Sequence, residues 1–326
     1  MKCAWTYACY ESMTAMSHTI LHVGLISAVF LAACSSSDGA NIPPPDTSGA
    51  ATDPGAGTDP GGAAGTPKSI PAGGTEGCGA GAFTAGDAQA KSIEVNGAKR
   101  TYLLTIPAGY DAYRAYPLVF VFHGGGGTGK NERQYFGLEE IAAGNAIFAY
   151  PDGKGGDWDL DTKTEDNEDV AFFDALVAEI GKNACIAKSK VFATGSSMGA
   201  YFSNQLGCRR GGVLRAIAPH AGGGPFDDDD AYDDQGHLRC AGKPVAAMIF
   251  HGEDDDTVSL ADGKLTRDHW VWANGCRDNA QPSNPSPCVT YDGCKNQVTW
   301  CQIPGLGHSV WSAGRQATWT FFASFE

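Results

Sequence analysis

Positive charge is scarce in this chain of 326 residues, which holds 23 lysines and arginines against 37 aspartates and glutamates. The formal net charge is −14, and the basic residues are scattered along the sequence rather than clustered. Nucleic-acid binding needs a concentrated basic surface that displaces counterions from phosphates. The sequence therefore argues against a nucleic-acid partner.

The chain also lacks an apolar run long enough to cross a bilayer, which takes about 20 residues in a helix. The run Ile20–Ala33 fits the apolar region of a signal peptide instead. It ends in Leu31-Ala32-Ala33-Cys34, which resembles the bacterial lipobox, where the cysteine is lipidated. We expect residues 1–33 to be a lipoprotein signal peptide and a lipid on Cys34 to be the only membrane attachment. An ordinary cleaved signal, giving a secreted protein, is the alternative.

Aromatic residues are absent between residues 34 and 77, where glycine, proline, alanine, threonine and aspartate dominate. Such a segment buries almost no apolar surface, so we expect a disordered tether that holds the rest of the chain away from a cell surface or outer membrane. Residues 78–326 then form the folded domain, whose length is usual for one domain. We expect this domain to be a monomer.

No pair of cysteines has the C-x-x-C spacing of a zinc site, so the sequence does not favour structural zinc. Of the 11 cysteines, eight follow residue 34. An even number in an exported chain indicates disulfides, with buried free thiols as the alternative.

Apolar strand patterns alternate with helical ones along residues 78–326, which predicts a mostly parallel sheet covered by helices. The first two strands flank Asn96-Gly97, a typical hairpin turn. Further strands are expected at 116–124, 146–153, 189–195, 214–222, 243–252 and 297–305, and helices at 169–183 and 197–208.

Gly195-Ser196-Ser197-Met198-Gly199 matches G-x-S-x-G between an apolar strand and a helical stretch. This context is that of a nucleophile elbow, in which two glycines permit the tight turn that exposes the serine. We expect Ser197 to be a catalytic nucleophile in an α/β-hydrolase fold. A strand–helix turn without chemistry is the alternative.

A nucleophilic serine needs a histidine base and an acid that orients it, and this fold orders them serine, acid, histidine. His308 alone has a late position in a glycine-rich loop after a strand. The acid follows the strand at 243–252, where Asp254, Asp255 and Asp256 are all candidates.

Glycines 124–127 follow His123 at the end of an apolar strand. Here backbone amides can converge on a developing oxyanion, and we expect the amides of Met198 and Gly125 to do so. The stretch 124–130 also fits the phosphate loop G-x-x-x-x-G-K, but Asn131 stands where Ser or Thr would bind magnesium.

The spacing of Asp157, Asp159, Asp161 and Glu168 copies part of a calcium loop, although Thr162 replaces its turn glycine. We favour an acidic surface loop there. Trp158 lies on the side of the sheet where ligands bind in α/β folds, so it is a candidate for stacking on an acyl group or sugar. Anchoring of the loop in the core is the alternative for this side chain.

In combination these motifs resemble the secreted feruloyl esterases and their relatives, the polyhydroxybutyrate depolymerase-like and acetylxylan esterase group. The resemblance covers most of residues 78–326. It rests on FHGGGG at 122–127, AYPDG at 149–153, EDVAFFDALV at 168–177, CIAKSKVFATGSSMGA at 185–200, FHGEDDDTV at 250–258, WANGC at 272–276, YDGC at 291–294, VTWCQIPGLGH at 298–308 and Trp311.

The family pattern H-G-x-x-D-x-x-V implies Asp255 as the acid, because Val258 then falls in place. The same resemblance implies disulfides that brace the loop before His308, for which we expect the pairs Cys276–Cys301 and Cys288–Cys294. Trp158 and Trp311 are the expected substrate-binding residues. No metal or organic cofactor is implied.

The resemblance implies a serine esterase acting on hydroxycinnamoyl (feruloyl) or acetyl esters of plant polysaccharide. Ser309-Val310-Trp311 is nearer to the depolymerase-like members, so a polyhydroxyalkanoate depolymerase is the alternative enzyme. A catalytically inactive glycan-binding surface lipoprotein is the alternative of another class.

Overall fold

Apolar residues occupy both faces of the central strands, so helices have to cover both sides of the sheet. In β3 (Tyr116–Phe122), Leu118 and Phe120 belong to one buried cluster, whereas Val119 and Val121 belong to another. This alternation follows from the two-residue period of a strand. The sheet therefore separates two apolar cores.

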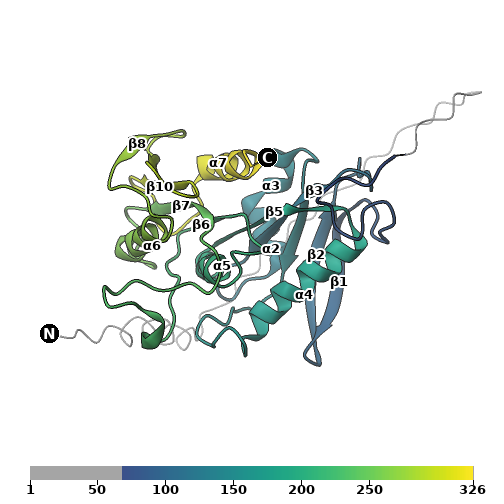
Figure 1. Cartoon of the computed structure of the whole chain (residues 1–326), viewed down its shortest axis with the longest axis horizontal. Helices are drawn as coiled ribbons and strands as arrows, with labels where there is room; N and C mark the ends of the chain where they lie inside the picture. Colours follow the sequence, from purple (N-terminus) through teal and green to yellow (C-terminus); the bar gives the residue numbers. More distant parts are fainter. Residues whose placement is uncertain (1–67, 326) are drawn as a thin grey trace, which may run out of the picture. The chain divides into compact units, whose positions relative to one another are not determined.

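The computed structural model describes residues 68–325, and their ten-stranded sheet has the order β1-β2-β4-β3-β5-β6-β7-β10-β9-β8 (Figure 1). In this order the six strands from β4 to β10 are parallel to one another. The strands β2 and β9 pair with them in the antiparallel direction at the two edges. The strands are β1 (Gly86–Val95), β2 (Ala98–Ile106), β3, β4 (Ile147–Pro151), β5 (Ile186–Ser196), β6 (Ala216–His220), β7 (Ala246–Gly252), β8 (Ala280–Pro282), β9 (Val289–Tyr291) and β10 (Val298–Ile303).

One core holds side chains of α4, α5 and α6, and the other holds side chains of α2, α3 and α7. A parallel sheet with helices on both faces is the predicted α/β-hydrolase arrangement. The helices are α2 (Gly129–Phe136), α3 (Leu138–Ala142), α4 (Glu168–Asn183), α5 (Met198–Arg209), α6 (Leu260–Ala273) and α7 (Ser312–Ala323).

The chain reverses its direction of winding at β3, which lies between β4 and β5 in the sheet. The connection from β3 to β4 carries α2 and α3, whereas the connection from β4 to β5 carries α4. Ligands of open α/β sheets bind beyond the carboxyl ends of the strands at such a reversal. His123 follows β3 and Ser197 follows β5, so both lie at this point.

The predicted signal peptide and Cys34 lie outside the described residues. The folded part begins earlier than the predicted residue 78, because Thr75 is already bonded to the domain: its hydroxyl donates to the Ala184 carbonyl at 2.8 Å and accepts from the Ile186 amide at 3.0 Å. Thr75 and Gly77, which we assigned to the tether, thus contact the folded domain. Within residues 68–325 no helix has the length and apolar character of a membrane span.

All eight cysteines after residue 34 form disulfides, as expected, but two predicted pairs are wrong. Cys276 binds Cys294 and Cys288 binds Cys301; the other bridges are Cys78–Cys185 and Cys208–Cys240. The register between β9 and β10 explains why Cys288 pairs with Cys301 and not with Cys294. Val289 lies opposite Trp300, so the next residues outward, Cys288 and Cys301, face each other across the strands.

Candidate active site

Ser197 occupies the turn between β5 and α5 with φ 52° and ψ −121°, a conformation that a residue other than glycine rarely adopts. Its amide donates to the His220 carbonyl at 3.0 Å, and its carbonyl accepts from the amides of Ala200 and Tyr201. These bonds hold the strained turn in place, as the elbow geometry requires.

The two glycines of the motif are required by the close approach of β3. A Cβ on Gly195 would lie 2.4 Å from the Phe122 carbonyl oxygen, and one on Gly199 would lie 2.0 Å from it. Backbone atoms at such distances have to move apart. Glycine therefore lets the end of β3 pack directly against the elbow.

Asp255 and His308 meet at the end of the sheet. The His308 Nδ1 lies 2.9 Å from Asp255 Oδ2 and 3.0 Å from Oδ1. An ionised carboxylate only accepts hydrogen bonds, so Nδ1 carries the hydrogen and Nε2 has a free lone pair. The His308 side chain is 24 % exposed, whereas that of Asp255 is fully buried.

Asp255 is held by its own backbone turn. Its Oδ1 accepts from the amides of Thr257 at 3.0 Å and Val258 at 2.9 Å. Asp254 and Asp256 are exposed. Of the three aspartates at this turn, the structure thus brings only Asp255 to the histidine.

The glycine loop after β3 is fixed by His123. The Gly153 amide donates to His123 Nε2 at 2.9 Å, so Nδ1 carries the hydrogen and donates to the Gly124 carbonyl at 2.8 Å. Burial lowers the pKa of this imidazole. The Gly127 amide donates to the same carbonyl at 3.0 Å. The loop lies against the elbow, since a Cβ on Gly124 would be 3.4 Å from the Ser197 Cβ.

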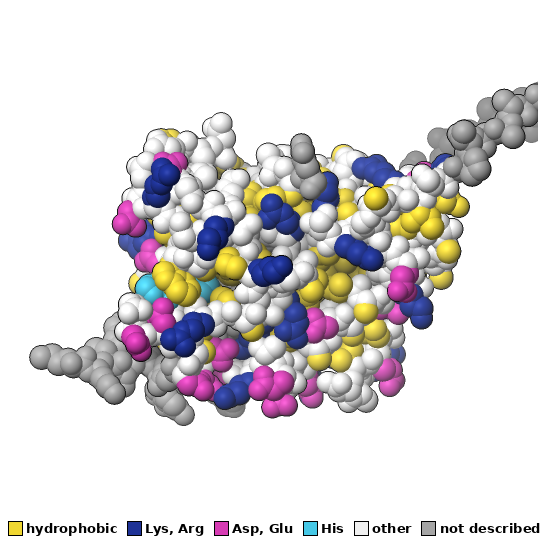
Figure 2. Space-filling view, in the orientation of Figure 1, with side chains coloured by type: hydrophobic (Ala, Val, Ile, Leu, Met, Phe, Trp, Pro, Cys, Tyr) yellow, Lys and Arg dark blue, Asp and Glu magenta, His cyan; other side chains and the backbone are white. Residues whose placement is uncertain are grey.

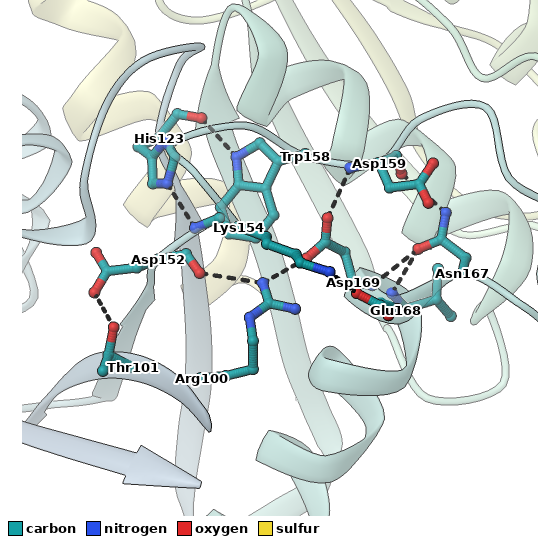
Figure 3. A network of polar contacts seen from close by, with 12 residues as sticks. Arg100, Thr101, His123, Asp152, Lys154, Trp158, Asp159, Asn167, Glu168 and Asp169 are labelled. Carbon is teal, nitrogen blue, oxygen red and sulfur yellow. Dashed lines mark hydrogen bonds and ion pairs between the residues drawn. The ribbon is translucent and has the colours of Figure 1, made fainter. Parts of the chain in front are cut away.

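A polar network connects this loop to the outer strands (Figure 3). Arg100 of β2 donates to the Asp152 carbonyl at 3.2 Å and forms a buried ion pair with Asp169. The other Asp169 oxygen accepts from the Asp159 amide at 2.7 Å. Asn167 caps α4 by accepting from two of its amides. The network rigidifies residues 152–169, which supply the partner of His123.

Trp158 is a core residue, and the expectation that it stacks on substrate is wrong. Its side chain is 2 % exposed, and its Nε1 donates to the His123 carbonyl at 2.8 Å. Its ring is stacked on Phe202 with centroids 4.9 Å apart. The loop-anchoring alternative is thus the one observed. Trp311 is partly buried just before α7, and its role in substrate binding stays a prediction.

Three of the four carboxylates of the calcium-like spacing, those of Asp157, Asp159 and Glu168, already bind other protein groups. Glu168 forms a salt bridge with Lys154 at 2.7 Å (Figure 3), and Asp159 Oδ1 accepts from the amides of Asp161 and Thr162. Asp157 Oδ1 accepts from the Gly126 amide at 3.1 Å. The acidic surface loop is therefore the better description of this segment.

One group of potential metal ligands occurs among residues 68–325, namely Cys208, Cys240 and His269. The two cysteines are joined in a disulfide, so their sulfurs are not thiolate ligands. The phosphate-loop alternative also finds no support. The amides of Gly126, Gly127 and Gly129 already donate to protein oxygens.

Sequence reasoning missed Glu132, a buried carboxylate behind the elbow that accepts from the Ser196 hydroxyl at 2.6 Å. One signal was present in the sequence. Glu132 precedes Phe136 by four residues, so both lie on the same face of a helix, and Phe136 is buried.

Known proteins that are similar to the chain in sequence include feruloyl esterases. No family model matches it. The probable feruloyl esterase C of Aspergillus clavatus is 32 % identical over 247 residues, covering 71 % of this chain and 85 % of that protein. Feruloyl esterase C of Emericella nidulans is 32 % identical over 246 residues, covering 70 % and 85 %.

Solved structures are similar in fold. The acetyl xylan esterase from Aspergillus awamori has a TM-score of 0.55 at 18 % identity, over 72 % of this chain and 99 % of that one. An S-formylglutathione hydrolase from Agrobacterium tumefaciens has a TM-score of 0.51 at 13 % identity, over 72 % and 93 %. At these identities the likeness concerns the α/β-hydrolase fold alone.

Proposed function

The chain belongs to the feruloyl esterase family and is a carboxylic ester hydrolase, and from this premise we propose that it cleaves hydroxycinnamoyl or acetyl esters of plant polysaccharide. The names of the relatives, which are feruloyl esterases, support this class of substrate. The proposed mechanism uses Ser197 as nucleophile, His308 as base and Asp255 as the orienting acid.

In the first step His308 Nε2 takes the hydroxyl proton of Ser197 while Oγ attacks the ester carbonyl carbon. The carbonyl π electrons move onto oxygen, and the amides of Met198 and Gly125 donate to the resulting oxyanion. Collapse of this intermediate expels the alcohol, which takes the proton from His308. Asp255 stabilises the imidazolium meanwhile, because its carboxylate already accepts from Nδ1.

The second step releases the acid. His308 takes a proton from water, the hydroxide attacks the acyl carbon, and the same amides hold the second oxyanion. Collapse breaks the bond to Ser197 Oγ, which recovers its proton from His308. The cycle needs no metal or organic cofactor, since every proton moves between these side chains, water and substrate.

The observation that carries the proposal is that the strained Ser197 turn follows β5 and the Asp255–His308 pair follows β7 and β10, all at the carboxyl ends of parallel strands of one sheet. A panel of methyl ferulate, p-nitrophenyl acetate, acetylated xylan and hydroxybutyrate polymer tests the substrate class. We expect hydrolysis of the first three by the wild type and none by Ser197→Ala. Turnover of the polymer alone would favour the depolymerase, and binding of xylan without hydrolysis would favour an inactive glycan-binding protein.

We further propose export through the predicted signal of residues 1–33 and a lipid anchor on Cys34. The disulfide-bonded domain supports export, because disulfides persist in oxidising compartments. Radiolabelled palmitate should enter the wild type and not Cys34→Ser. Labelling that persists in Cys34→Ser would contradict an anchor on Cys34, and no label in either protein would leave the secreted enzyme.

A further inference from the structure

Glu132 lies in the first turn of α2, and its side chain is buried directly behind the nucleophile elbow. The residue is 5 % exposed, and its Oε1 accepts from the hydroxyl of Ser196 at 2.6 Å. Ser196 is itself buried and immediately precedes Ser197. The contact therefore reaches the nucleophile through a single peptide.

The same carboxylate faces two backbone amides, those of Ser196 and Gly124. Burial raises the pKa of Glu132 to about 7, while these amides and the Ser196 hydroxyl oppose the rise. Within residues 68–325 the carboxylate has these hydrogen-bond donors but no salt-bridge partner. It thus joins the elbow after β5 to the glycine loop after β3.

The buried carboxylate of Glu132 is unfavourable for folding stability. Burying one without a cation is unfavourable, and apolar side chains of similar volume generally stabilise a core better. Departures from that rule concentrate at functional sites. Glu132 lies between the elbow and the glycine loop of the site, so a role in the site would explain why a carboxylate is buried there.

The contact with Gly124 bears on the expected oxyanion donor. The Gly124 carbonyl is held by His123 Nδ1 and the Gly127 amide, and the Gly124 amide faces Glu132. The peptide that joins Gly124 to Gly125 is planar and trans, so its N–H points opposite to its carbonyl. The bonds to the Gly124 carbonyl therefore set the direction of the Gly125 N–H, and Glu132 faces the other end of the same residue.

Helix α2 also reaches the loop that carries His308. The Val310 amide donates to the hydroxyl of Tyr135 at 2.8 Å. Glu132 and Tyr135 are three residues apart and lie on neighbouring positions of the helix surface. One short helix thus contacts the elbow, the glycine loop and the histidine loop.

We propose that Glu132 is a positioning residue for ester hydrolysis, which holds the Ser196–Ser197 peptide and the Gly124–Gly125 peptide at a fixed spacing. The inference rests on the proposed function, since it assigns Glu132 a role in that reaction. Glu132 acts through Ser197, Met198 and Gly125 and does not touch the substrate.

The test compares Glu132→Gln with Glu140→Gln, which makes the same chemical change at an exposed position of α3. Glutamine keeps the shape but turns an amide group toward the donors of Ser196 and Gly124. A misplacement near 1 Å lowers rates by about 100-fold, so we expect kcat to fall on the order of 10- to 100-fold in Glu132→Gln. KM should stay near wild type and the thermal midpoint should not fall, and Glu140→Gln should match wild type in all three.

A double-mutant cycle with Ser196→Ala adds a readout that a merely structural role would not move. If Glu132 acts through Ser196, Glu132→Gln should lower kcat less in the Ser196→Ala background than in wild type. Ser196→Ala alone should lower kcat with KM unchanged, and it tests the role even if Glu132→Gln fails to fold.

Wild-type kcat in Glu132→Gln or in Ser196→Ala would overturn the role of Glu132. A loss of activity in proportion to the loss of folded protein would also overturn this role. Failure of the proposed function is distinguishable, because it would appear as activity that survives in Ser197→Ala. Abolished activity in Ser197→Ala beside full activity in Glu132→Gln would refute the positioning role alone.

Discussion

The carboxylate of Asp255 and the imidazole of His308 lie 53 positions apart in sequence and 2.9 Å apart in space. Parallel pairing of β7 with β10 produces this contact, because the turn after each strand emerges at the same edge of the sheet. Asp255 is buried and His308 is partly exposed, so one side of the pair faces protein and the other faces solvent.

This contact predicts which aspartate matters. Asp255→Asn removes the charge that orients His308 and stabilises its imidazolium, so kcat should fall by about 10⁴-fold, as for other triads. Asp254→Asn and Asp256→Asn are matched controls at exposed neighbours and should retain activity within about threefold. Steady-state kinetics on p-nitrophenyl acetate decide the matter, and a severe loss in either control would place the acid elsewhere.

The buried Glu132 predicts a pH dependence of folding stability. Its pKa rises from the usual 4.5 to about 7 in the folded protein. Between those values Glu132 keeps its proton in the folded state and releases it in the unfolded state. The contribution of Glu132 to the free energy of unfolding is therefore complete below pH 4.5 and is lost as the pH rises through 7. Its size is about 3 kcal/mol, at 1.36 kcal/mol per pH unit.

Urea unfolding of wild type and Glu132→Gln at several pH values measures that contribution. As the pH rises from 4.5 to 8, the unfolding free energy of the wild type should fall relative to that of Glu132→Gln. Glu140→Gln, tested in the same way, should show no such trend. A difference that stays constant with pH would show that Glu132 ionises normally.

The disulfides near His308 predict a local effect of reduction. Cys276–Cys294 closes a loop of 18 residues and Cys288–Cys301 one of 13, and each joins the β10 region to its surroundings. Loops of this size contribute about 3 kcal/mol. Replacing Cys276 and Cys294 by alanine should lower kcat before the domain unfolds, because Cys294 lies shortly before β10 and His308 lies in the loop that follows this strand.

The matching control replaces Cys208 and Cys240, which join the end of α5 to the segment before β7. That pair should affect the thermal midpoint without a selective loss of kcat. Activity and tryptophan fluorescence followed together against temperature distinguish the two effects. Simultaneous loss of both signals in the Cys276/Cys294 variant would refute a local role.

The approach of β3 to the elbow predicts that Gly199 tolerates no side chain. Gly199→Ala places a Cβ 2.0 Å from the Phe122 carbonyl oxygen, so we expect a loss of activity with destabilisation of several kcal/mol, about the upper range for overpacking. Gly109→Ala is the control, since nothing lies within 4 Å of a Cβ there. Thermal unfolding of both variants checks this, and a Gly199→Ala protein as stable and active as the control would contradict the described turn.

Much of the fold was predictable from strand periodicity and turn residues. The Asn96-Gly97 hairpin is confirmed, with φ of 51° and 78° at the two positions, and the order of parallel strands follows from alternating elements. The positions of Ser197 and His308 were predictable because glycines and chain order mark them. Asp255 needed the family resemblance, because Asp254 and Asp256 have the same chemistry.

Other features depend on contacts that local sequence does not encode. The pairing of Cys288 with Cys301 depends on the register between β9 and β10, and the connection over residues 292–297 is longer than the two-residue turns whose type sets the register. Trp158 gave no sign of whether its indole points to solvent or to Phe202. Glu132 was missed because its partners, Ser196 and Gly124, come from two other segments.

Reaction with a fluorophosphonate tests the central claim, that Ser197 is the nucleophile, most directly. The oxygen of a serine that a neighbouring base activates attacks the phosphorus of the reagent and expels fluoride, and peptide mass spectrometry locates the phosphonylated residue. We predict one label per chain on Ser197, loss of esterase activity in parallel with labelling, and neither labelling nor activity in Ser197→Ala. A label on another serine, or full activity in Ser197→Ala, would contradict the account.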